Sequence, residues 1–146
     1  MSDPQSRLTK GEFEVLSGFR YQLRRFSHWS EQLTQKAGVT NLQYLLMLHI
    51  KGFADREWAT ITELAERLQA KHHGAVALVT RCEKLGLVKR CRGRPDGREV
   101  EVHLTAKGER LVEQLARQHS DELTRLRGVL TVPGRAQSKR NGKNPR

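Results

Sequence analysis

The sequence has few cysteines and no long apolar run. Its two cysteines, Cys82 and Cys91, are too few to form a disulfide framework. The uninterrupted apolar runs, such as the one at residues 45–48, are far shorter than the stretch needed to cross a bilayer. No apolar stretch near the first residues has the pattern of a secretory signal peptide. We therefore expect a cytoplasmic protein with reduced thiols and no membrane partner.

Acidic residues are also scarce in comparison with basic ones. The chain has 27 Lys and Arg residues against 16 Asp and Glu residues, which gives a net charge of +11 over 146 residues. Such an excess favours an anionic partner, with nucleic acid first, an acidic membrane surface second, and a basic protein without a polyanion partner as the remaining alternative. A chain of this length suits one domain, and its small core favours pairing with a second copy.

The sequence also has none of the short motifs that mark common enzyme classes. There is no G-x-S-x-G, no phosphate-binding glycine loop and no paired-carboxylate motif. A catalytic cysteine paired with His103 is conceivable, but Cys82 lies on an apolar helix face, where a thiolate is disfavoured. We therefore expect no catalysis, no catalytic residue and no cofactor.

Three capping boxes, each with a threonine followed three residues later by Glu or Gln, punctuate the first half of the chain. They begin at Thr9, Thr40 and Thr60. A long apolar periodicity follows the first of these and stops at Gly38, and a shorter one follows the second and ends at Gly52. The third opens a two-turn helix that ends near residue 68. The pattern therefore predicts three successive helices.

The second half begins with a further helix and continues with a hairpin. The helical pattern runs through residues 72–85, and Gly86 suits its C-cap. Residues 87–92 and 99–104 have strand patterns on either side of the turn-forming sequence 93–97. Thr105 can cap a last long helix that extends to Leu130, before Pro133 and Gly134.

This order predicts a mainly α protein with a small β-wing, that is, a winged helix-turn-helix with long terminal dimerisation helices. We divide the chain into a flexible N-terminus (1–8), one domain (9–130) and a basic disordered tail (131–146). Within the domain, residues 9–38 and 105–130 form the dimerisation helices and residues 40–104 form the DNA-binding lobe. The tail carries five basic residues and no acid, and we expect it to add non-specific phosphate contacts.

The second helix of a helix-turn-helix enters the major groove of DNA, and arginines of a wing enter the minor groove. Arg90 and its neighbours make the hairpin basic, and Asp96 can hold Arg98 by a charge-assisted hydrogen bond. The alternative for the helix is a solvated face without a ligand, and for the hairpin a solvated charged loop. The predicted DNA-contacting residues are His72, His73, Gly74, Ala75, Ala77, Thr80, Arg81, Lys84, Arg92, Arg94, Asp96 and Arg98.

Residues 12–130 resemble the MarR family, the multiple-antibiotic-resistance type of winged-helix regulators. The resemblance rests on ITELAERL (61–68), VTRCEKLGLVKR (79–90) and PDGREVEVHLTAKGERL (95–111), the last with the Asp-x-Arg wing signature and Leu-Thr-x-x-Gly. It implies a cytosolic, nucleoid-associated homodimer that binds pseudo-palindromic double-stranded DNA, usually as a repressor, with Arg98 in the minor groove and a recognition helix over residues 73–85. The chain departs from the family after Leu130, where a basic tail replaces a further helix.

The resemblance also implies control by a small molecule, commonly an aromatic anion. Candidate ligand-binding residues are Tyr21, Arg25, His28, Trp29 and Tyr44, for which core or dimer packing is the alternative. Some relatives sense oxidants through a cysteine in the first helix, where this chain has none, and others bind zinc. The six histidines include no close-spaced ligand motif, so we expect no metal site. A non-specific architectural DNA-binding protein and a redox- or metal-responsive regulator remain the alternatives.

Overall fold

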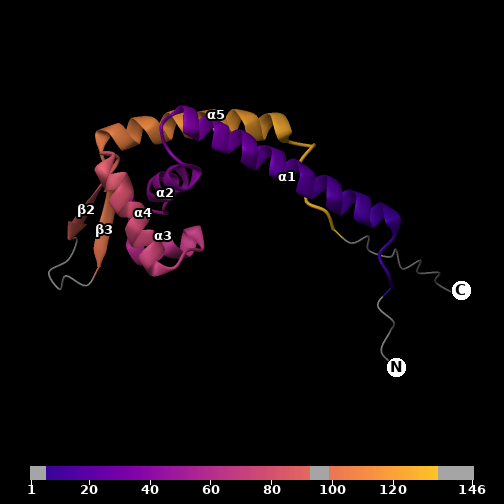
Figure 1. Ribbon diagram of the computed structural model, residues 1–146, viewed down its shortest axis with the longest axis horizontal. Coiled ribbons are helices and arrows are strands. Elements are labelled where there is room, and N and C mark those ends of the chain that lie inside the picture. The colour runs from indigo at the N-terminus through magenta and orange to yellow at the C-terminus, as the bar shows by residue number, and fades with distance from the viewer. Residues whose placement is uncertain (1–5, 93–98, 135–146) are drawn as a thin grey trace, which may run out of the picture.

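The computed structural model describes residues 6–92 and 99–134 of the chain. The turn at 93–98 and the tail at 135–146, together with residues 1–5, lie outside the described residues. The described residues form five helices and a three-stranded sheet, and the long first helix projects from a winged lobe (Figure 1). The predicted class, mainly α with a small β-wing, is confirmed.

The first two helices begin at the predicted capping boxes. Helix α1 spans Lys10–Lys36 and helix α2 spans Asn41–Lys51, with Thr9 and Thr40 as their N-caps. In each box the threonine hydroxyl accepts from the third backbone N–H of its helix, and the Glu or Gln side chain accepts from the cap N–H. Gly38, with a φ of 84°, ends α1 in a conformation that favours glycine.

Helices α3 (Ile61–Leu68) and α4 (His72–Lys84) form the helix-turn-helix. Thr60 caps α3 through the third capping box, and Gln69 ends it in the left-handed conformation. One face of α4 is buried against the lobe through Ala75, Leu78, Val79 and Cys82. Gly86, with a φ of 75°, follows the end of α4 as predicted.

The wing sheet contains one strand that the sequence pattern did not predict. Strands β2 (Val88–Arg92) and β3 (Val100–Leu104) are the predicted antiparallel pair. A third strand, β1 (Trp58–Thr60), pairs with β3, so the strand order is β1-β3-β2. Three residues are too few to show an alternating pattern, and β1 is recognised only through its partner β3.

Helix α5 spans Ala106–Leu126 and lies across the top of the lobe (Figure 1). It ends four residues before Leu130, where the apolar spacing had placed its end. Arg127 has a φ of −59° and a ψ of 125°, and Gly128 has a φ of 90°, so a turn leads the chain out of the helix. Apolar spacing alone could not show this stop, because Leu130 keeps the helical period after the helix has ended.

The core lies where α2, α3, α4, the sheet and α5 meet. Its fully buried side chains include Leu46, Leu64, Val79 and Val102, one each from α2, α3, α4 and β3. Lys51 of α2 forms ion pairs with Glu57 and Glu109, at 2.9 and 2.8 Å, and so ties the lobe to α5 at the surface. The core thus fixes the position of α4, the predicted recognition helix.

Candidate nucleic-acid interface

Helix α4 separates a buried face from an exposed polar face. Six of the predicted DNA-contacting residues are exposed on this helix, and none of them carries negative charge: His72, His73, Gly74, Ala77, Arg81 and Lys84. Ala75 corrects the prediction, because its side chain is fully buried and cannot reach a thymine methyl group. The exposed set is small, polar or basic, which suits base edges and phosphates in a major groove.

The N-terminal turn of α4 is open to a close approach by another molecule. Its N-cap, Lys71, makes no side-chain hydrogen bond to the first backbone N–H groups. A methyl group added at Gly74 would meet nothing within 4 Å. Among the described residues, none therefore blocks a close approach to Gly74 in the turn that carries His72 and His73.

Thr80, a predicted DNA contact, is bound by Arg90 of the predicted basic hairpin. Thr80 is half-buried, and its hydroxyl accepts a hydrogen bond from an Arg90 amino group at 2.9 Å. Arg90 also forms an ion pair with Glu83 of α4 at 2.7 Å. The strand period could have revealed this, because Arg90 shares a face of β2 with buried Val88.

The described part of the wing contributes one exposed arginine, Arg92, at the end of β2. The predicted wing residues Arg94, Asp96 and Arg98 lie outside the described residues, so their roles stay predictions. Figure 1 shows β2 and β3 beside α4 at one end of the lobe.

The five candidate ligand-binding residues do not all come together. Tyr44 is buried and stacks on the His119 ring at 4.4 Å, and Trp29 meets the same ring edge-on at 5.2 Å. Tyr21 and His28 are exposed on α1, with the Arg25 guanidinium 5.7 Å from the Tyr21 ring. The structure thus gathers two of the five around a histidine that the prediction left out.

His119 joins three helices through hydrogen bonds as well as stacking. Its Nδ1 lies 2.7 Å from the Leu115 carbonyl oxygen, and its Nε2 lies 2.7 Å from the Ser30 hydroxyl of α1. Ser30 in turn donates to Asn41 at the start of α2, at 2.9 Å. Burial raises the pKa of the neighbouring Tyr44 phenol, so that group stays neutral.

Two hollows border this cluster. One of about 370 Å³ lies between α2 and α5 and is lined by Tyr44, His119 and Arg127, among others. Another of about 200 Å³ lies between α1 and α5, where Arg25 and Arg125 stand beside Phe26 and Trp29. Arg25 and Trp29 of the predicted set therefore line one hollow, and Tyr44 lines the other.

The cysteines occupy different environments. Cys82 is fully buried in α4, and burial raises the pKa of its thiol to about 11. Cys91 is half-buried in β2. Within residues 6–92 and 99–134, no three His, Cys, Asp or Glu side chains converge to hold a metal ion. In the same described ranges, no helix is long and apolar enough to cross a membrane.

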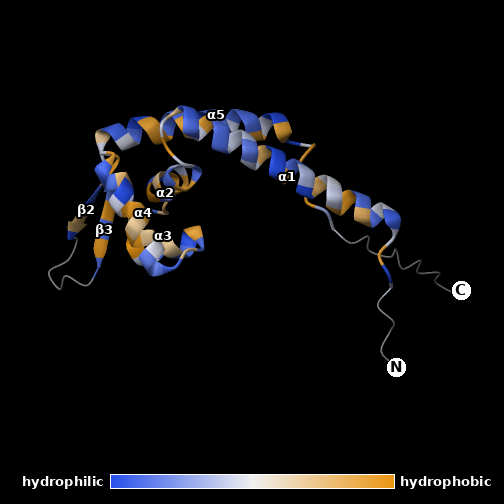
Figure 2. Ribbon diagram, in the orientation of Figure 1, coloured by the Kyte–Doolittle hydropathy of each residue, from blue (hydrophilic) through white to orange (hydrophobic). Residues whose placement is uncertain are grey.

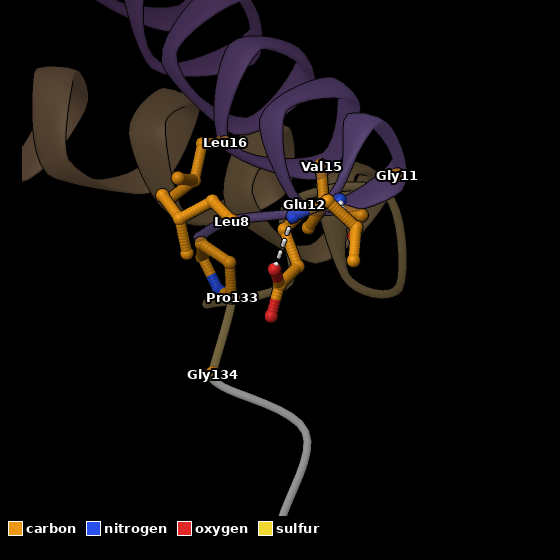
Figure 3. A pocket seen from close by; sticks show the side chains of 8 residues that line it. Leu8, Gly11, Glu12, Val15, Leu16, Pro133 and Gly134 are labelled. Atoms are coloured by element: carbon orange, nitrogen blue, oxygen red, sulfur yellow. Dashed lines mark hydrogen bonds between the residues drawn. The ribbon is translucent and has the colours of Figure 1, made fainter. Parts of the chain in front are cut away.

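The N-terminal half of α1 carries apolar side chains that the lobe does not cover. Phe13, Val15 and Leu16 are 55%, 56% and 43% exposed, and the buried residues of α1 both lie in its last third. A hollow of about 500 Å³ is lined by the start of α1 and by Pro133 and Gly134. Figure 3 shows Leu8, Leu16 and Pro133 around it, with the Glu12 carboxylate bound in the capping box.

Comparisons with known proteins show which family part of this chain resembles. The model of the MarR family matches residues 37–99, a range that includes α2, β1, α3, α4 and β2 and stops just before β3. No curated protein matches the chain. The match to residues 37–99 confirms the resemblance drawn from the sequence motifs.

Solved structures share the fold over most of the chain. AbsC, a MarR family transcriptional regulator from Streptomyces coelicolor, has a TM-score of 0.74 at 22% identity, covering 88% of this chain and 86% of that chain. Sco3205 from the same organism, solved in complex with DNA, has a TM-score of 0.71 at 24% identity, with coverages of 91% and 82%. MarR from E. coli gives 0.62 at 20% identity, with coverages of 83% and 86%. The winged lobe thus matches the MarR family model, and the chain has the winged-helix fold of MarR family transcriptional regulators.

Proposed function

We propose that this protein is a sequence-specific DNA-binding transcriptional regulator that represses from a pseudo-palindromic operator as a homodimer. The observation that carries the proposal is the exposed face of α4, which offers histidine, glycine, alanine, arginine and lysine beside a wing strand ending in Arg92. The DNA complex of Sco3205, which has the same fold, supports the assignment. A regulator that binds DNA needs no catalytic site, in keeping with the sequence motifs.

A homodimer accounts for the uncovered apolar side chains of α1. This helix of 27 residues is about 40 Å long, and its N-terminal half lies beyond the lobe. Figure 2 shows apolar residues along that projecting half. Contiguous apolar surface of this kind marks an interaction site, and a two-fold partner would cover it with the same surface. Two lobes related in this way would present two α4 helices to one duplex.

Selection of bound fragments from random and genomic DNA tests the proposal. The protein is incubated at physiological salt with excess competitor, and the retained fragments are sequenced. An inverted repeat with half-sites about one helical turn apart is the expected result. Retained DNA with no enriched sequence would overturn it in favour of a non-specific architectural protein.

A matched pair of arginine variants locates the interface. Arg81→Ala removes a charge from the exposed face of α4, and Arg117→Ala removes the same charge from α5, where the side chain is 73% exposed. We expect only Arg81→Ala to weaken binding to the selected site, by about 1–3 kcal/mol if it contacts a base edge. Equal losses in both variants would instead indicate a general charge effect.

Arg98→Ala tests the wing in the same assay. The residue lies outside the described residues, and the proposal for it comes from the Asp-x-Arg sequence at 96–98. A minor-groove contact predicts a loss of about 1–3 kcal/mol on the selected site. No loss would remove Arg98 from the wing assignment.

Release by a small aromatic anion is a second element of the proposal, supported by the hollows beside Tyr44 and beside Arg25 and Trp29. Both hollows border the junction of α1, α2 and α5, where a ligand could shift α1 relative to the lobe. The test titrates phenolic acids against DNA affinity and thermal stability. If neither changes, this mode of control is wrong.

Two alternative modes of control are tested by their effect on DNA affinity. Peroxide tests control by an oxidant, and a chelator tests control by a metal ion.

A further inference from the structure

Arg90 turns its side chain away from the exposed face and toward α4. One amino group donates to Glu83 Oε1 at 2.7 Å. The other donates to Thr80 Oγ1 at 2.9 Å and to the Val76 carbonyl oxygen at 3.3 Å. Acceptors from two successive turns of the recognition helix therefore hold one guanidinium from the wing.

The same carboxylate also binds the backbone of the wing strand. β2 is an edge strand of the sheet, because it pairs only with β3. The backbone N–H of Arg90 donates to Glu83 Oε2 at 3.2 Å. Glu83 thus accepts from both the main chain and the side chain of Arg90, which fixes the edge strand at one point along α4.

The geometry suits arginine in particular. A guanidinium is planar and presents several N–H groups in a fixed fork, whereas a lysine ammonium is a compact point charge. Here the two ends of the fork reach three acceptors at once. Thr80 completes the arrangement, because its hydroxyl donates to the Val76 carbonyl oxygen at 3.0 Å while accepting from Arg90. Its hydroxyl is therefore already bound.

We propose that Arg90, Glu83 and Thr80 form a clamp that sets the position of the wing relative to the recognition helix, and that Arg90 is a positioning residue and not a DNA contact. This inference rests on the proposed function, since it concerns how two elements reach two grooves together. β2 leads directly from the clamp to Arg92 and the wing turn. A shift of β2 along α4 would therefore displace the wing from the minor groove while α4 occupies the major groove.

Conservative variants at Arg90 distinguish the clamp from a phosphate contact. A phosphate contact accepts lysine, because only the charge is needed, but the clamp requires the fork. We expect Arg90→Lys to lower affinity for the selected site by about tenfold or more, the scale of a hydrogen bond to a charged group. The salt slope should stay unchanged, since no phosphate contact is lost. Arg117→Lys, on the exposed surface of α5, is the control and should bind within about twofold of wild type.

Removal of Glu83 should change DNA affinity in opposite directions under a general electrostatic effect and under the clamp. Removing an acidic residue near DNA strengthens binding if electrostatics alone matters. If Glu83 anchors the clamp, Glu83→Ala weakens binding to the selected site although the protein becomes more basic. Glu66→Ala removes the same charge from α3 without touching β2 and is the matched control. We expect Glu83→Ala to weaken and Glu66→Ala to maintain or strengthen specific binding.

Amide hydrogen exchange without DNA separates failure of the clamp from failure of the proposed function. The Arg90 amide should exchange faster in Glu83→Ala than in wild type, while amides of α5 stay unchanged. Slow exchange in both proteins, or an Arg90→Lys variant that keeps wild-type affinity, would overturn the clamp. An Arg90→Ala variant that lowers the salt slope by about 0.9 would also overturn it and would make Arg90 a phosphate contact. Wild-type protein that selects no sequence would refute the proposed function and leave the exchange result standing.

Discussion

Gly108 lies where the first turn of α5 passes closest to the end of α4. A Cβ built at this position would be 2.1 Å from the Leu87 carbonyl oxygen, which is backbone and cannot move aside easily. Thr105, the N-cap of α5, donates to the Gly86 carbonyl oxygen at 2.6 Å and holds the same approach. The glycine of the Leu-Thr-x-x-Gly motif therefore permits close packing of two elements.

Gly108→Ala should therefore destabilise the protein. The forced separation of α5 from the α4–β2 turn should lower the free energy of unfolding by about 1–3 kcal/mol or more, as overpacking does in cores. Urea unfolding at one protein concentration measures this change. Gly74→Ala is the control, because nothing lies within 4 Å of its added methyl group. Equal stability of the two variants would contradict the close approach.

Cys82 predicts a pH dependence of stability. Its thiol has a pKa of about 11 in the folded protein and an ordinary value of 9.0, because burial disfavours the thiolate. Above pH 9 the unfolded chain loses the proton first, so the free energy of unfolding falls as pH rises toward 11. The fall approaches about 1.4 kcal/mol per pH unit in that window. Below pH 9 this contribution is constant.

Cys82→Ala isolates that effect from the titration of lysines. Unfolding of both proteins is measured under reducing conditions at pH 8 and pH 10.5. We expect the wild type to lose more stability than the variant over this interval. Parallel losses in the two proteins would mean that the Cys82 thiol does not cause the pH dependence.

At the scale of elements, the three capping boxes differ in what their helices support. Thr60 is buried, and its box partner Glu63 also pairs with Arg56, which stacks over Phe53 and Trp58 at 4.2 Å each. Thr9 caps the exposed, projecting end of α1. The sequence motif is the same at both threonines, but of these two boxes only the one at Thr60 joins a helix to the core.

Thr60→Ala should lower the free energy of unfolding by about 1 kcal/mol, through the loss of the cap at the start of α3. Thr9→Ala should change it less, because the first turn of α1 can fray without exposing the core. Urea unfolding of the two variants gives the comparison. A larger loss in Thr9→Ala would show that the start of α1 is structurally more important than its exposure indicates.

At the scale of the whole molecule, the projecting half of α1 predicts dimerisation. Leu16→Glu places a charge among the exposed apolar residues of that half. It should shift the protein from dimer to monomer, measured by sedimentation over a range of concentrations, and weaken binding to an inverted repeat more than to a half-site. Leu42→Glu is the control, because Leu42 is 54% exposed on α2, away from the projecting half of α1. A dimer unaffected by Leu16→Glu would place the interface elsewhere.

The sequence by itself determined the helices, the hairpin and the polar face of α4. Capping boxes and apolar periods are local, so Thr9, Thr40 and Thr60 marked helix starts without knowledge of the fold. The wing and helix motifs are also contiguous in the chain, so the family resemblance could be drawn from the sequence. The family model that matches residues 37–99 confirmed that resemblance.

Only the tertiary structure decided which side chains meet. Strand β1 forms because β3 lies beside it, and Arg90 binds Glu83 and Thr80 because β2 packs along α4. His119, which interrupts an apolar stripe in the sequence, became the centre of a hydrogen-bonded junction between α1, α2 and α5. Such contacts join residues 7 to 89 positions apart. No local period specifies them, because they depend on how the elements pack together.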